Sequence, residues 1–375
     1  MIPLNDNLAS LRRSGIRRYT NLAKTVPGCI MLTIGEPDFD TPEPVKAAAM
    51  TALFQNRTHY APNQGIEKLR HEIAAFETER GMACKPEQVL ITVGATGALF
   101  TAILGILNPG EEVIIPTPAF PLYESIVTVA GGKPVLLDTK NDGFQLTAQA
   151  LNKAITPKTK AIVLNSPNNP TGVVLSEQSL TNVKAAVAGK PIFVICDNVY
   201  QGLSAETLPD LSRDPELKEQ ILLCQSFSKP WAMTGWRVGY LVGPQDVIAR
   251  LLLLSAAEVA SIPTFLQDAC VTALHTDVSA MAETYRRRRQ LVCLRLTEMG
   301  LSFPEPKGAF YVFPDISRFG LTDEEFCTRL ITDGGVAAVP GSCFGCPGHI
   351  RISCCCSDAD LEAGLARLER FLPTL

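Results

Sequence analysis

The sequence predicts an α/β protein that combines a large domain, built on a mainly parallel, doubly wound sheet, with a smaller α+β domain. Apolar runs of strand length alternate with helix-like stretches through the middle of the chain. The 375 residues exceed one ordinary domain. A hydrophobic content of 46% with 19% charged residues indicates that the chain buries a large core.

The first 80 residues predict helices around one short strand. An arginine-rich helical pattern covers residues 8–19, and a strand-like run at 32–34 ends in the turn Gly35-Glu36-Pro37. Alanine-rich residues 44–57 predict a helix because Pro44 suits a first helical turn. A second helix at 66–80 ends at Gly81.

The middle of the chain contains the alternation that predicts the sheet. The Gly94–Gly97 turn follows the first strand-like run and leads into a helix at 98–107. Helical stretches between most of the strands indicate parallel pairing, with ligands bound at the carboxyl ends of the strands. The predicted strands are 89–93, 112–115, 134–137, 161–164, 192–196, 221–224 and 238–242.

The last third of the chain changes to an α+β pattern. A helix-prone region runs to about residue 300 and is interrupted at Pro263. Strands are then predicted at 309–313, 336–339 and 350–353, and helices at 323–332 and 358–371. We therefore expect a large domain at 40–270 and a small domain formed by 1–39 and 271–375. Residues 1–39 are expected to be an N-terminal arm that packs with the small domain.

Charge and hydropathy exclude several classes of partner. The formal net charge is −4, and the one basic run, Arg286 to Arg289, is typical of a solvated helix face rather than of a nucleic-acid site. The chain shows no secretory signal pattern and no apolar stretch of membrane-spanning length. We expect a cytoplasmic protein with small-molecule substrates and without nucleic-acid or membrane partners.

The cysteines are best interpreted as reduced thiols. There are 12 of them in a chain without a signal pattern. Cys343, Cys346 and His349, followed by residues 354–356, have the composition of a metal site. Residues 349–356 form a strand-like run, however, so alternate side chains point to opposite faces and small buried thiols are the favoured interpretation. We expect no metal.

One lysine after a buried strand carries the strongest chemical signal. Lys229 lies in Ser226-Phe227-Ser228-Lys229, with Arg237 eight residues later. Poor solvation at that position lowers an ammonium pKa, and the free amine then forms Schiff bases with aldehydes such as pyridoxal phosphate. Ser226, Ser228 and Arg237 could hold the phosphate. The alternative is a surface lysine followed by an unrelated arginine.

Two further charges lie in apolar strands. Asp197 ends the run at 192–196, where a carboxylate can stay ionised and pair with a protonated pyridine nitrogen. Its alternative role is that of a helix N-cap. Arg351 is a lone charge between Ile350 and Ile352, and a buried arginine needs a carboxylate partner. That partner is a substrate carboxylate or an internal ion pair.

These motifs resemble one known family. Ser226 to Lys229, followed by Met233-Thr234-Gly235-Trp236-Arg237-Val238-Gly239-Tyr240, is similar to the cofactor-lysine segment of the fold-type I, pyridoxal-phosphate-dependent class I/II aminotransferases. The likeness runs from Gly35 to Arg351 in the family's order and includes Ser166 to Gly172. It implies the PLP-dependent transferase fold, pyridoxal phosphate as cofactor and a homodimer with shared active sites.

The resemblance also implies roles for individual residues. Lys229 holds the cofactor, Asp197 pairs with its ring nitrogen, and Tyr200 and Asn169 bind its phenolic oxygen. Phe120 stacks on the ring, or is an ordinary core phenylalanine. Gly35, Asn169 and Arg351 bind the substrate carboxylate. The implied phosphate ligands are Ala95, Thr96, Ser226, Ser228, Arg237 and, from the partner chain of the dimer, Tyr60.

The implied reaction is a ping-pong transfer of an amino group between an L-amino acid and a 2-oxo acid, with Lys229 as acid and base. A PLP-dependent carbon–sulfur β-lyase and a PLP-binding regulatory protein are the alternatives. Thr96 replaces a lysine found in some aspartate-specific members, which argues against a simple aspartate aminotransferase. Residues 14–19 and 32–35 are similar to the acetyl-diaminopimelate and aromatic aminotransferase subgroup.

Overall fold

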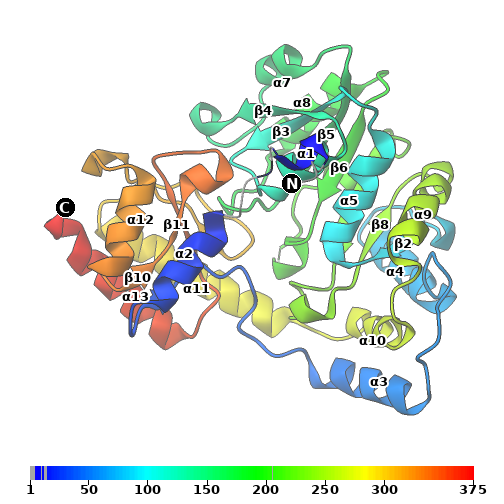
Figure 1. Ribbon diagram of the computed structural model, residues 1–375, viewed down its shortest axis with the longest axis horizontal. Helices are drawn as coiled ribbons and strands as arrows, with labels where there is room; N and C mark the ends of the chain where they lie inside the picture. The colour runs from blue at the N-terminus through cyan, green and yellow to red at the C-terminus, as the bar shows by residue number, and fades with distance from the viewer. Residues whose placement is uncertain (1–4, 10, 12–14, 205) are drawn as a thin grey trace.

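A seven-stranded sheet forms the centre of the computed structural model, which describes residues 5–9, 11, 15–204 and 206–375 (Figure 1). The strands lie in the order β2-β8-β7-β6-β5-β3-β4, and all are parallel except β8, which is antiparallel to both of its neighbours. The predicted mainly parallel sheet is therefore confirmed. The bounds are β2 (Val89–Thr92), β3 (Glu112–Thr117), β4 (Lys133–Asp138), β5 (Thr159–Asn165), β6 (Phe193–Asp197), β7 (Ile221–Ser226) and β8 (Gly239–Val242).

Helices cover both faces of this sheet, because its central strands are apolar on both sides. On one face, α5 (Gly94–Ile106), α6 (Leu122–Val129) and α9 (Gln245–Val259) bury one apolar cluster. The cluster on the other face also takes side chains from α3 (Glu43–Phe54), α4 (Glu67–Glu79), α7 (Ala148–Ala154), α8 (Glu177–Val187) and α10 (Thr264–Leu274). These two layers give the doubly wound arrangement its core.

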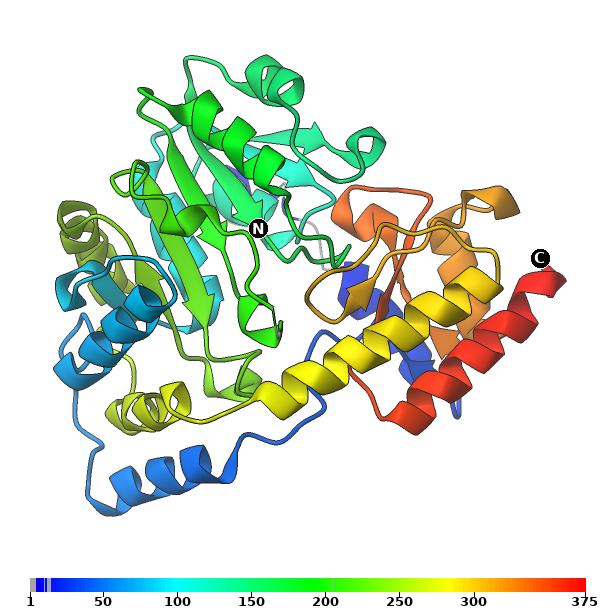
Figure 2. The same ribbon diagram turned by 180° about the vertical axis from the view of Figure 1, so that it is seen from behind.

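The C-terminal part and the N-terminal helix share a third apolar cluster. Its helices are α2 (Gly15–Lys24), α11 (Ser279–Glu298), α12 (Asp323–Thr332) and α13 (Asp358–Phe371), and Figure 2 shows α11 in yellow beside α13 in red. The short strands β1 (Ile30–Met31) and β10 (Val336–Ala337) pair in parallel. Strands β11 (Val339–Pro340), β12 (Ile350–Ser353) and β9 (Tyr311–Val312) form an antiparallel sheet. The domain limits at residues 39/40 and 270/271 stay a prediction.

Several element boundaries differ from the sequence prediction. The strand expected at 32–34 pairs at Ile30–Met31, where its partner β10 is only two residues long. The run 336–339 divides into β10 and β11, which pair with different strands. Helix α5 begins at Gly94 because this glycine, at φ +64°, turns the chain directly out of β2. The helix expected at 8–19 is instead α1 (Asp6–Ala9) and α2, and residues 12–14 lie outside the described part.

The basic run on α11 is only partly a solvated face. Near the surface, Arg286 pairs with Glu283 and Arg287 pairs with Asp358. Arg288 and Arg289 are 7% and 8% exposed, so the predicted solvated face is wrong for these two side chains. The reason is packing: α11 is covered on one side by α13 and on another by strand β9.

Two findings concern membranes and metals. No helix within the described residues is long and apolar enough to cross a bilayer. The same part of the chain contains no group of three histidine, cysteine or acidic side chains placed to hold a metal ion. All of the cysteines are free thiols, and Cys346 and Cys354 are buried.

Arg288 connects three segments, and its removal tests that connection. Its Nε donates to Asp358 Oδ1 at 2.6 Å and its Nη1 to Asp38 Oδ1 at 2.8 Å. Arg288→Met leaves a partly buried Asp38 carboxylate without its cation, so the free energy of unfolding should fall by about 3 kcal/mol in a urea titration. Arg287→Met is the matched control and should cost at most about 1 kcal/mol because its side chain is 62% exposed. Equal losses in the two variants would contradict the assignment.

Candidate active site

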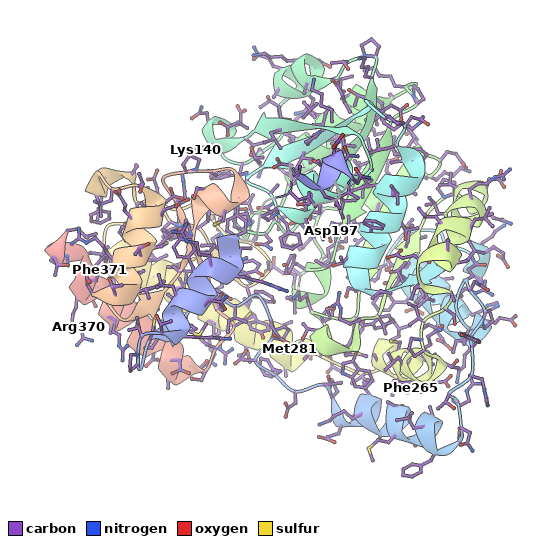
Figure 3. The ribbon with its side chains drawn as sticks, in the orientation of Figure 1. Lys140, Asp197, Phe265, Met281, Arg370 and Phe371 are labelled. Carbon is purple, nitrogen blue, oxygen red and sulfur yellow. The ribbon has the colours of Figure 1, made fainter. Side chains whose placement is uncertain are left out.

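A cavity of about 300 Å³ opens at the carboxyl ends of β5, β6 and β7. Asp197, labelled in Figure 3, lies near the middle of the molecule, where the large sheet faces the C-terminal part. Every predicted site residue except Tyr60 lines this cavity. These residues are Gly35, Ala95, Thr96, Phe120, Asn169, Asp197, Tyr200, Ser226, Ser228, Lys229, Arg237 and Arg351.

The parallel strands explain why residues far apart in the sequence meet here. In the sheet register, Asn165 at the end of β5 lies beside Asp197 at the end of β6. Asn165 Nδ2 donates to the Asp197 carbonyl at 2.9 Å, and Asn165 Oδ1 accepts from Asn169 N at 2.8 Å. One buried amide therefore joins the Asn-Pro-Thr-Gly turn to the strand that carries the carboxylate.

Lys229 has an amine suited to nucleophilic chemistry. Its Nζ donates to the Gly35 carbonyl at 2.6 Å and lies 5.9 Å from the centre of the Phe310 ring. Burial lowers the pKa of this ammonium from 10.5 to about 8, in agreement with the sequence-based expectation. A large fraction of the amine is therefore unprotonated at mildly alkaline pH.

Asp197 is a buried carboxylate held by a tyrosine. Tyr123 OH donates to Asp197 Oδ2 at 2.5 Å, and Val199 N donates to Oδ1 at 3.5 Å. Burial raises the pKa of Asp197 to about 6, although both hydrogen bonds oppose that rise. The carboxylate is ionised at neutral pH and has no basic side chain in hydrogen-bond contact among the described residues, so it suits a cationic ligand group.

The phenol of Tyr200 lies in a chain of polar side chains. It accepts a hydrogen bond from Asn169 Nδ2 at 3.3 Å and contacts Tyr311 OH at 3.3 Å. Burial raises the pKa of Tyr200 well above its usual value. This phenol therefore stays protonated and can donate to an anionic oxygen.

A further group of residues lining the cavity has the composition of a phosphate site. Helix α5 presents its N-terminus with Ala95 and Thr96, and the hydroxyls of Ser226 and Ser228 lie 2.7 Å apart. Arg237 completes the group and donates to the Thr234 carbonyl at 2.9 Å. A Cβ on Gly94 would lie 2.8 Å from Arg237 Nη2, so a glycine here lets the guanidinium approach the helix end.

Arg351 is buried with hydrogen-bonding capacity to spare. It is 2% exposed, and it donates from Nη1 to Asn169 Oδ1 at 2.9 Å and from Nη2 to the Thr33 carbonyl at 2.7 Å. Its Nε has no partner, and no carboxylate in the described chain lies within 4.0 Å of it. The internal ion pair considered as an alternative is thus absent there. A buried, unpaired guanidinium of this kind fits a substrate carboxylate.

Two aromatic predictions have different outcomes. Phe120 lines the cavity, with its ring 6.0 Å from that of Tyr123, and it also packs against the apolar cluster of the sheet. Both interpretations of this residue are therefore consistent with its position. Tyr60 is 92% exposed and does not line the cavity of its own chain. Its role in a neighbouring chain stays a prediction.

Sequence reasoning missed part of the site. Tyr123 and Tyr311 contact the predicted side chains directly, yet each lies in an apolar stretch where a buried tyrosine is ordinary. Asn165 ends its strand, and that position was the only available signal. The other lining residues that were not predicted are Ile16, Leu99, Val199 and Thr234.

Comparisons with known proteins agree on one family. Residues 27–368 match the family described as aminotransferase class I and II. A probable N-acetyl-LL-diaminopimelate aminotransferase of Bacillus subtilis is 40% identical, covering 98% of this chain and 95% of the relative. Aromatic-amino-acid aminotransferase 2 of Thermococcus litoralis is 38% identical over 98% of both chains. The structure of aspartate aminotransferase from Thermus thermophilus with maleate is 37% identical, with a TM-score of 0.93 over 99% of this chain and 100% of that chain.

The lowered pKa of Lys229 has a consequence for stability. Between about pH 8 and pH 10.5 the unfolded chain binds the proton that Lys229 of the folded chain has lost, so the contribution of Lys229 to the free energy of unfolding of the ligand-free protein should rise with pH. Lys229→Met removes the buried ammonium, so the variant should be the more stable protein at pH 7, by up to about 3 kcal/mol. That difference should shrink from pH 8 to pH 10.5.

Lys153→Met, an exposed change on α7, is the control and should keep the pH profile of the wild type. A difference between Lys229→Met and wild type that does not vary with pH would contradict the lowered pKa.

Proposed function

The chain belongs to the class I and II aminotransferases, and from this premise we propose that Lys229 carries pyridoxal phosphate and that Arg351 binds the substrate carboxylate. The protein is an enzyme that transfers an amino group between an amino acid and a 2-oxo acid. Members of its family use pyridoxal phosphate. The relatives are named aminotransferases, which favours amino transfer over the lyase and regulatory alternatives.

One observation carries the site assignment. An amine with a pKa of about 8 lies in the same cavity as a buried carboxylate and a buried, unpaired guanidinium. An aldehyde cofactor with a basic ring nitrogen satisfies the amine and the carboxylate, and the carboxylate of an amino-acid substrate satisfies the guanidinium. Bound there, the cofactor supplies the electron-withdrawing ring that makes the α-proton of an amino acid acidic enough to remove.

The residues that would hold the cofactor follow from their chemistry. Asp197, which accepts a hydrogen bond from Tyr123, would pair with the ring nitrogen. Tyr200 would donate to the phenolic oxygen, together with Asn169, whose Nδ2 donates to the Tyr200 hydroxyl. The phosphate would be bound by the N-terminus of helix α5, by two serine hydroxyls and by one guanidinium. The residues are Ala95, Thr96, Ser226, Ser228 and Arg237.

The chain's own groups account for substrate orientation and proton transfer. Arg351 takes the α-carboxylate, and its contact with Asn169 fixes the plane of the guanidinium. Lys229 Nζ, hydrogen-bonded to the Gly35 carbonyl, is the group that takes the α-proton and returns it. Gly35 must stay small because a Cβ there would lie against Tyr311 OH.

The choice of amino donor rests on the residues around the substrate. The similar proteins are named for N-acetyl-LL-diaminopimelate, aromatic amino acids and aspartate. Thr96 brings no charge to the turn where some aspartate-specific members have a lysine. Ile16 and Leu99 add apolar surface to the cavity. We expect aspartate to be a poorer donor than an amino acid with an uncharged side chain.

We also propose a homodimer in which Tyr60 reaches the phosphate of the partner chain. The exposed fractions of Met50, Leu53 and Phe54 on α3 are 58%, 45% and 84%, and Tyr60 nearby is 92% exposed. Clustered apolar side chains of this size are typical of a protein interface. A cytoplasmic location stays an expectation from the sequence.

The direct test of amino transfer is a half-reaction followed by absorbance. The holoenzyme should change its cofactor spectrum on addition of an amino acid and recover it on addition of a 2-oxo acid. Lys229→Ala should lose at least about 10³-fold in turnover, since it removes the group that moves the proton. Release of ammonia and a 2-oxo acid from a thioether amino acid without any acceptor would instead identify a lyase.

The shared site can be tested at Tyr60. Tyr60→Phe removes only a hydroxyl from an exposed side chain, so folding should be unaffected. Loss of one hydrogen bond to a charged phosphate should raise the dissociation constant of the cofactor about tenfold, as followed by absorbance during dialysis. When the wild-type protein is diluted until its dimer dissociates, its dissociation constant for the cofactor should rise by at least as much as in Tyr60→Phe. Equal affinities in dimeric wild type and variant would exclude the role.

A further inference from the structure

A second cavity, of about 450 Å³, lies outside the active site. Its walls come from helix α11, seen in yellow in Figure 2, from residues 203, 204 and 206, and from the segment 303–307. None of these residues takes part in the reaction proposed above. The cavity therefore needs an explanation of its own.

Arg289 is the unusual side chain of this cavity. It is 8% exposed and donates from Nη1 to the Ala309 carbonyl at 2.9 Å. Burial lowers its pKa, which shows that its charge is poorly solvated. The guanidinium has five N–H donors, and this is the one hydrogen bond it makes within the described chain.

The neighbouring arginines show what Arg289 lacks. Arg286, Arg287 and Arg288 each have a carboxylate within 2.8 Å. No carboxylate of the described residues lies within 4.0 Å of Arg289, and Glu206 acts on it only as a more distant charge that raises its pKa. A buried guanidinium without an ion pair is costly, and an external carboxylate would remove that cost.

The rest of the cavity limits the kind of ligand. Arg286 and Lys307 add positive charge at the walls, while Glu206 and Glu305 add negative charge. Phe303 and Leu203 contribute apolar surface. Opposite charges close together above an apolar wall match a zwitterion with a hydrocarbon side chain better than a simple anion.

We propose that this cavity binds a free α-amino acid, with its carboxylate on Arg289, its ammonium near Glu206 and Glu305, and its side chain against the apolar wall. The site does not depend on the catalytic assignment, since it lies on different residues. It adds a second amino-acid site to the chain.

The position of Arg289 connects this site to the catalytic one. Ala309, whose carbonyl it holds, has φ +56°, a conformation that is uncommon for alanine. The next two residues are Phe310, which contacts Lys229, and Tyr311, which contacts Tyr200. Arg289 is therefore connected through Ala309 to Tyr311, which lines the catalytic cavity.

The experiment uses protection of a thiol inside the cavity of the holoenzyme. Cys293 lines the cavity, and Cys84 is a partly buried reference thiol elsewhere. The rate of alkylation by N-ethylmaleimide at each cysteine is measured by peptide mass spectrometry. L-leucine should slow the alkylation of Cys293 and leave the alkylation rate of Cys84 unchanged. 3-Methylbutylamine, which lacks the carboxylate, should not protect, and 4-methylpentanoate and inorganic phosphate should protect more weakly than leucine.

Variants separate this site from the active site and from folding defects. Arg289→Lys should raise the leucine concentration needed for half-protection at least about tenfold, because a point charge replaces the fork. Lys307→Met removes an exposed amine that pairs with Glu305 at 3.5 Å and not with the proposed ligand carboxylate, so it should change that concentration by at most about threefold. Arg287→Met, on the same helix but outside the cavity, should have no effect. Absence of protection by leucine, equal protection in all variants, or stronger protection by phosphate would overturn the proposal.

Discussion

The burial of one ammonium group in a cavity that also contains a carboxylate is the constraint on which this structure depends. Desolvation acts on Lys229 and Asp197 in opposite directions, lowering the first pKa to about 8 and raising the second to about 6. The lowered pKa brings Lys229 towards neutral pH, where proton transfer is efficient, while Asp197 at a pKa of about 6 is still mostly ionised at neutral pH. A site open to water would leave both residues near their ordinary values and without this function.

The cavity exists only because two parts of the chain meet. Arg351 on β12 bonds to Asn169 after β5, and Tyr311 on β9 contacts Tyr200 after β6. Each contact joins the small antiparallel sheet to the large parallel one. The substrate-binding and cofactor-binding groups are therefore held in one geometry by hydrogen bonds that are themselves part of the site.

Helix α11 shows how neighbouring charges in one sequence take different roles. Arg288 is buried between Asp38 and Asp358 and so joins three segments, whereas Arg289, one residue later, has no carboxylate within reach in the described structure. The 100° rotation between successive helix positions places them against different neighbours. The four arginines of this run therefore do not form a single solvent-exposed basic face.

The sequence by itself determined the α/β architecture, most strand positions and 12 of the 19 residues that line the cavity, because apolar periodicity and local motifs are properties of short segments. Lys229, Asp197 and Arg351 could be found in this way, whereas Asn169 was found through the resemblance to a known family. Tertiary structure alone decided the partners: Tyr123 on Asp197, Tyr311 on Tyr200, and the burial of Arg288 and Arg289. Tyr123 and Asp197 are 74 positions apart in the chain, and Tyr200 and Tyr311 are 111 apart. A local pattern contains no information about which distant side chain will pack against it.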